Sequence, residues 1–101
     1  MQSNFVAEKA LGYAQITAID TATLLSSVAG GIPVGTTLVL ISPQTQAIRW
    51  RDDGTSPTAA VGYPLAVGSE LRYTAQSIPR VSVISQVAGA AINVMFYGST
   101  T

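Results

Sequence analysis

The chain has 101 residues and no net charge, with charged residues at 10% of the total and hydrophobic residues at 48%. Because it contains neither Cys nor His, disulfides, thiolate metal sites, imidazole-dependent triads and most transition-metal sites are excluded. One Lys and four Arg stand against five acidic residues, so no cluster of basic residues is available for nucleic acid or for an anionic membrane. We expect a single domain over residues 1–101, and a weakly charged surface of this kind promotes association.

Two long uncharged runs, Thr21 to Ile48 and Val81 to the C-terminus, are the candidates for membrane segments. Gly, Pro, Ser, Thr, Gln and Asn interrupt both runs, and neither offers about 18 consecutive apolar residues. The first residues also lack the basic region and apolar core of a secretory signal. The sequence therefore predicts a soluble protein without a membrane partner.

The first third of the chain offers three elements. Residues 1–9 are polar and mixed, and we expect an N-terminal arm there. Tyr13 to Ile19 alternates, with Ala14, Ile16 and Ala18 on one face, which is typical of a strand. At most one short helix is expected, near residues 22–28; a strand there is the open alternative, because Gly30 and Gly31 would stop a helix.

The middle of the chain predicts two strands and a long loop. Thr36 to Ile41 is apolar on both faces, so it should be covered on both sides, within a sandwich or at a subunit contact. Ser42 to Thr45 has a turn composition. Ala47 to Arg51 then alternates, with Ile48 and Trp50 inward and Arg49 and Arg51 outward. Residues 52–58, Asp-Asp-Gly-Thr-Ser-Pro-Thr, form the strongest loop signal.

The last third predicts three more strands, over Glu70–Ala75, Arg80–Gln86 and Ala91–Tyr97, with a connection near residues 76–79. Ile92, Val94 and Phe96 should face opposite to Asn93, Met95 and Tyr97. Residues 33–38 resemble residues 64–71, and this echo predicts two equivalent hairpins. Together the short strands indicate an all-β fold, a single small antiparallel β-sandwich or barrel of jelly-roll-like type.

No set of residues predicts catalysis. Glu8, Asp20 and Glu70 are isolated, and the only lysine has no serine at a spacing that would use it as a base. Asp52-Asp53-Gly54 resembles the start of a calcium loop but lacks the alternating acids that follow in such loops, so an Asx turn is the simpler interpretation. We expect no enzyme, no catalytic or metal-binding residue and no cofactor.

Four residues are candidates for contact with a partner: Arg49, Arg51, Arg72 and Tyr63. Arginines on outward strand faces could pair with a partner's carboxylates. The alternative is intramolecular pairing with Asp52, Asp53 or Glu70, or solvation. The aromatic residues could form a ligand platform, or they could belong to the core; they are Trp50, Tyr63, Tyr73, Phe96 and Tyr97.

Residues 47–65, Ala-Ile-Arg-Trp-Arg-Asp-Asp-Gly-Thr-Ser-Pro-Thr-Ala-Ala-Val-Gly-Tyr-Pro-Leu, resemble a pattern in small structural proteins of tailed bacteriophages. In that pattern an Arg-Trp-Arg-Asp-Asp-Gly strand end is followed by a Pro-Thr loop and a Gly-x-Pro-Leu bend. The likeness continues through residues 68–73 and 88–97. It implies a virion component, a capsid decoration protein or an accessory protein of head or tail, and it assigns no functional residue.

The leading hypothesis is therefore a non-enzymatic capsid decoration (cement) protein that stabilises the phage head. It would be made in the host cytoplasm and located on the capsid surface. Its partners would be the major capsid protein and/or other copies of itself, most simply as a trimer on a local symmetry axis. The alternative is a receptor- or carbohydrate-binding module of a tail tip or fibre, which predicts exposed aromatic residues near Tyr63 and Tyr73.

Overall fold

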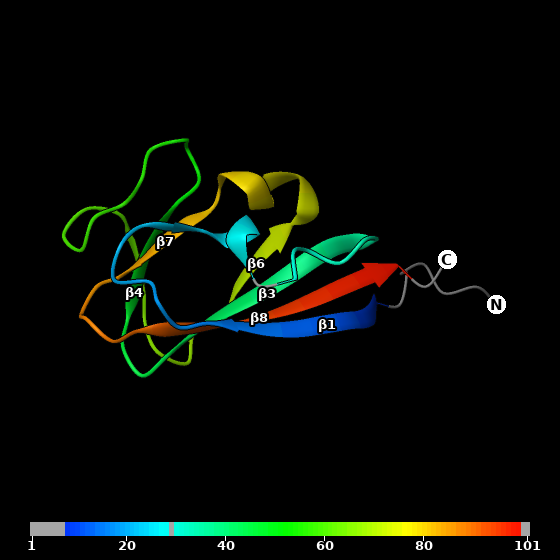
Figure 1. Ribbon diagram of the computed structural model, residues 1–101, viewed down its shortest axis with the longest axis horizontal. Coiled ribbons are helices and arrows are strands. Elements are labelled where there is room, and N and C mark those ends of the chain that lie inside the picture. Colours follow the sequence, from blue (N-terminus) through cyan, green and yellow to red (C-terminus); the bar gives the residue numbers. More distant parts are fainter. Residues whose placement is uncertain (1–7, 29, 100–101) are drawn as a thin grey trace.

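The computed structural model describes residues 8–28 and 30–99, and they form two antiparallel sheets of four strands each (Figure 1). The first, which we call the long sheet, has the strand order β1 (Glu8–Ile16), β8 (Ala91–Ser99), β3 (Thr36–Gln44) and β6 (Leu71–Thr74). The second, the short sheet, has the order β2 (Thr23–Leu24), β7 (Ser82–Ser85), β4 (Ile48–Arg51) and β5 (Tyr63–Leu65). The predicted all-β sandwich is confirmed.

The core lies between the two sheets, where alternate residues of each strand point inward. The predicted inward face of β8 is confirmed, because Ile92, Val94 and Phe96 are buried while Asn93, Met95 and Tyr97 are partly exposed. Ile48 on β4 is also fully buried. Period-two burial of this kind is what a strand with one covered face requires. The largest fully buried side chains are Ile19, Leu25, Ile41, Ile48, Ile78, Ile92, Val39, Val81, Val83 and Val94.

The two hairpins predicted from the internal echo do not form. β3 and β4 belong to different sheets, as do β6 and β7, so the chain crosses from one sheet to the other between the two strands of each predicted hairpin. β3 pairs with β6 in the long sheet and β4 pairs with β7 in the short sheet, antiparallel in both cases. Each of the two strand pairs, β3 with β4 and β6 with β7, thus contributes one strand to each sheet, and the corresponding strands lie side by side.

The turn predicted over Ser42–Thr45 begins too early. β3 continues through Pro43, which is buried and paired with Ile92, and it ends at Gln44. The carbonyl of Pro43 accepts a hydrogen bond from the N–H of Gly68 at 3.3 Å. In an extended strand the nitrogen of a residue points to the same side as its carbonyl, away from β8 here, so proline removes no bond from the β3–β8 ladder.

Other boundaries also differ from the sequence prediction. Residues 22–28 hold both alternatives, a short strand and a 3₁₀ helix, η1 (Leu25–Ser27). A second 3₁₀ helix, η2 (Ala75–Arg80), occupies the predicted connection. The predicted arm over residues 1–9 lies outside the described residues as far as residue 7, whereas Glu8 and Lys9 begin β1. β1 ends at Ile16, earlier than expected.

Candidate functional site

The outer face of the short sheet is covered by the loop of residues 52–62, which joins β4 to β5. Arg49, on the outward side of β4, donates from Nε to the carbonyl of Ala59 at 2.9 Å and from Nη1 to the carbonyl of Gly62 at 2.8 Å. On the same outward side of β7, Ser82 and Ile84 are only 5% and 8% exposed. We infer that the loop, folded back over the sheet, buries them.

Gly62 allows the loop to return to β5. Its φ of +150° belongs to glycine, and a Cβ there would lie 3.0 Å from both the Cβ of Arg49 and the Cβ of Pro57. Close to it, the N–H of Thr58 donates to the carbonyl of Val61 at 2.8 Å, which closes a tight turn. These contacts give the loop a defined conformation.

An ion pair fixes the start of the loop. Arg51 donates from Nε to Oδ1 of Asp53 at 3.0 Å and from Nη2 to Oδ2 at 2.5 Å, and the N–H of Thr55 donates to the same carboxylate at 3.3 Å. The hydrogen bonds from Arg51, together with that of Thr55, lower the pKa of Asp53 from 3.8 to about 2. Arg49 and Arg51 thus have intramolecular partners, while their contact with another protein stays a prediction.

Three aromatic side chains meet at the edge of the sandwich near the end of β4. The rings of Trp50 and Tyr63, opposite one another on paired strands, lie 5.4 Å apart in a tilted arrangement. Tyr73 on β6 meets Trp50 edge-on at 5.6 Å, and its hydroxyl donates to Oδ2 of Asp52. Burial and this hydrogen bond raise the pKa of Tyr73.

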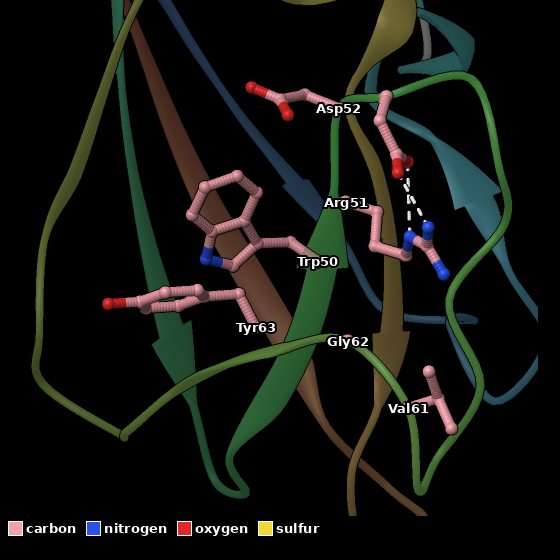
Figure 2. A pocket seen from close by; sticks show the side chains of 7 residues that line it. Trp50, Arg51, Asp52, Val61, Gly62 and Tyr63 are labelled. Carbon is pink, nitrogen blue, oxygen red and sulfur yellow. Dashed lines mark hydrogen bonds and ion pairs between the residues drawn. The ribbon is translucent and has the colours of Figure 1, made fainter.

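Beside this cluster lies a shallow cavity of about 360 Å³, which we call the aromatic cleft; it is lined by Trp50, Arg51, Asp52, Asp53, Val61, Gly62 and Tyr63. Figure 2 shows Trp50, Tyr63 and Asp52 on one side of β4, with Arg51 and its dashed bonds on the other. Tyr63 is 67% exposed. The exposed aromatic expected by the carbohydrate-binding alternative is therefore present at Tyr63, whereas Tyr73 is half-buried.

The indole nitrogen of Trp50 lies on the side of its ring that faces Tyr63 (Figure 2) and is buried without a hydrogen-bond acceptor among the described residues. The core interpretation of the aromatic residues holds in part, whereas the ligand-platform interpretation stays a prediction. Phe96 belongs to the core, Trp50 packs against the core, and Tyr63 covers Trp50 while its own ring stays open to solvent.

The outer face of the long sheet, which we call the open face, has a different character. Leu38 and Leu40 on β3 and Met95 and Tyr97 on β8 are only partly buried there, although three of these four are apolar. A hollow of about 210 Å³ lies between Leu38, Leu40, Tyr97 and Arg72. Thr36 to Ile41 is therefore covered by the core on one side alone, and a subunit contact on its other side stays a prediction.

The other end of the open face is polar and uncharged. Gln15 donates to Oε1 of Gln44 at 3.1 Å, and Asn93 donates to the same oxygen at 3.0 Å. The hydroxyl of Tyr13, whose side chain is 58% exposed, donates to Oδ1 of Asn93. These side chains hydrogen-bond to one another across β1, β8 and β3. The amide groups on this part of the open face therefore already have hydrogen-bond partners.

The four residues predicted for partner contact do not form one surface. Arg49, Arg51 and Tyr63 lie together around β4 and β5, whereas Arg72 lies on the open face. The side chain of Arg72 has no hydrogen bond or ion pair with any other residue that the structure describes. The candidates for partner contact did not include Leu38, Leu40 or Tyr97; the available signal was a strand apolar on both faces.

The carboxylate of Asp20 is held by hydrogen bonds within the fold. Asp20 accepts hydrogen bonds from the N–H of Gly89 at 3.0 Å and from Oγ of Ser85 at 2.8 Å, and these bonds lower its pKa. Within residues 8–28 and 30–99, no group of three acidic, His or Cys side chains is placed to hold a metal ion. The same residues contain no helix that is long and apolar enough to cross a membrane.

Comparison with known proteins adds no relative: no family model, no curated protein and no solved structure matches this chain.

Proposed function

We propose that this protein is a non-enzymatic structural component of a tailed-bacteriophage particle, where it decorates and stabilises the capsid. The observation that carries the proposal is the open face, on which apolar side chains of β3 and β8 remain in contact with water. Contiguous apolar surface of this kind marks an interaction site in many soluble proteins. The assignment to a phage rests on the resemblance over residues 47–65.

The chemistry of the open face suits burial against another protein. On β3, β6 and β8 its charged residue is Arg72, so little charge has to be desolvated when a neighbour packs on it. Arg72 at the rim of the hollow can form a bidentate pair with a carboxylate of that neighbour. We therefore expect binding that weakens little with added salt, because it depends mainly on apolar area.

The size of the face argues for many copies rather than one strong contact. The long sheet consists of three nine-residue strands and one short strand. With strands about 4.8 Å apart and residues about 3.3 Å apart along each strand, its outer face has an area of roughly 500 Å². A stable pairwise interface buries about 800 Å² on each partner. A single face therefore binds the shell weakly, and a trimer that presents three faces at once would gain from multivalency.

The first experiment is to locate the protein in purified particles. Quantitative mass spectrometry should find it at a copy number comparable to that of the major capsid protein, and cryo-electron microscopy should show its density on the outer shell. A few copies confined to the tail would contradict the decoration role and favour a receptor-binding module.

A second experiment tests the open face itself. Leu40→Glu places a charge in the hollow, and it should prevent incorporation into particles. Val67→Glu is the matched control, because Val67 is apolar, 51% exposed and outside the strands of the long sheet. Circular dichroism and thermal melting of both purified variants establish that they fold; normal incorporation of a folded Leu40→Glu protein would refute the assignment of this face.

A further inference from the structure

We propose that the aromatic cleft binds a neutral saccharide, with one sugar ring packed against Tyr63 and a hydroxyl group hydrogen-bonded to Asp52. The cleft is remote from the open face: it lies where the loop of residues 52–62 meets β4 and β5 of the short sheet. The inference therefore does not depend on the capsid role.

The aromatic wall is exposed and yet held in place. Tyr63 is 67% exposed, but it lies opposite Trp50 on paired strands, and their ring centres are 5.4 Å apart. Tyr73 supports Trp50 from the side. The negative face of an aromatic ring attracts the C–H groups of a sugar, which are slightly positive, and a ring fixed before binding loses little conformational entropy on binding.

One polar group beside the aromatic wall can accept a hydrogen bond. Oδ2 of Asp52 accepts the hydroxyl proton of Tyr73, which fixes the carboxylate, and Oδ1 has no partner among the described residues. Figure 2 shows Asp52 on the same side of β4 as Trp50 and Tyr63, with Arg51 on the other side. A sugar hydroxyl is a hydrogen-bond donor, and Oδ1 of Asp52 can accept from it.

The charges disfavour an anionic ligand. Arg51 compensates Asp53 through the 2.5 Å ion pair, so Asp52 leaves the lining of the cleft with a net negative charge. An anionic ligand would be repelled by that carboxylate, whereas a sugar hydroxyl can donate a hydrogen bond to it. A cationic ligand is the alternative, and the cationic probes named below distinguish it from a saccharide. A volume of about 360 Å³ is at the small end of ligand sites, about 300–1,000 Å³, and suits one or two sugar rings.

Trp50 provides the readout, because it is the one tryptophan of the chain and lines the cleft. The full chain is titrated with maltotriose, cellotriose and chitotriose while tryptophan fluorescence is recorded, and saturation-transfer NMR identifies the sugar protons in contact. For a shallow site we expect a Kd of about 1 mM for at least one of them. Choline and N-acetyl-lysine amide serve as cationic probes.

Variants assign the binding to the cleft. Tyr63→Ala should weaken saccharide binding roughly tenfold or more, and Tyr63→Phe should retain most of it. Tyr13→Ala is the matched control, because Tyr13 is a comparably exposed tyrosine on the open face, and it should bind as the unmodified protein does. Asp52→Asn should also weaken binding.

Three results would overturn the inference: binding of no saccharide in the titration, saccharide binding that Tyr63→Ala leaves unchanged, or binding of the cationic probes in place of the sugars. None of them bears on the position of the protein in the particle. Failure of the cleft and failure of the capsid role are therefore distinguishable.

Discussion

Arg49→Ala should loosen the loop of residues 52–62 without disturbing the sheets. Arg49 donates two hydrogen bonds to loop carbonyls, those of Ala59 and Gly62, at 2.9 and 2.8 Å. Alanine removes both donors but keeps the Cβ that lies close to Gly62. The loop then loses its attachment to the outer face of the short sheet.

The magnitude follows from these two bonds. A hydrogen bond from a charged group contributes about 1.5–3 kcal/mol when well buried, but Arg49 is only partly buried and solvent screens part of that. We expect a loss of about 1–2 kcal/mol in the free energy of unfolding, and a domain of this size loses roughly 4–8 °C in melting temperature for each kcal/mol. In addition, the amide of Val61, which donates to Thr58, should exchange its hydrogen faster.

Arg72→Ala is the matched control. It makes the same substitution on an exposed residue whose side chain has no hydrogen bond or ion pair within the described part of the chain, and a site of this kind usually changes stability by less than about 0.5 kcal/mol. Urea denaturation, thermal melting and hydrogen exchange are compared for both variants. If Arg49→Ala unfolds at the same denaturant concentration as Arg72→Ala and Val61 exchanges no faster, the loop is held by other contacts and the reasoning is refuted.

Two further predictions concern stability. Gly98→Ala should destabilise the fold by about 1–3 kcal/mol, because the added Cβ would lie 2.7 Å from the carbonyl oxygen of Gly35 and 2.8 Å from Cδ1 of Leu11; an unchanged urea midpoint would contradict this packing. Asp53 contributes stability through Arg51, and its pKa of about 2, below the ordinary 3.8, sets the pH range. The contribution should be complete above about pH 4 and lost as the pH falls through 2. The difference in unfolding midpoint between the unmodified protein and Asp53→Asn should therefore shrink over that range; a difference that persists at pH 2 would exclude the ion pair as its source.

Several features could be predicted from the sequence because they depend on neighbours along the chain. Alternation in residues 91–97 predicts which side chains of β8 enter the core, since successive side chains of a strand point to opposite faces. The same rule places Ile48 inward and Arg49 outward. The absence of His and Cys limits the available chemistry in any fold.

Other features are set by residues far apart in the sequence. Arg49 was expected to point toward solvent, but the loop of residues 52–62 folds back and accepts its hydrogen bonds. Pro43 reads as a turn residue, and only the pairing of β3 with β8 shows that its nitrogen lies on the side where no ladder bond is lost. The second apolar face of residues 36–41 was visible in the sequence, whereas its exposure follows from the sheet order.

The aromatic cleft shows the same division. The sequence contains Trp50 and Tyr63 and identifies the loop between them, but it does not determine that they lie opposite one another on paired strands. It also gives no sign that Tyr73 reaches Trp50 and Asp52 from the other sheet. Side-chain direction along one strand is a local property of the backbone, and the sequence by itself determines it. Which strands become neighbours, and what covers their outer faces, depends on long-range pairing, and only the tertiary structure decides that.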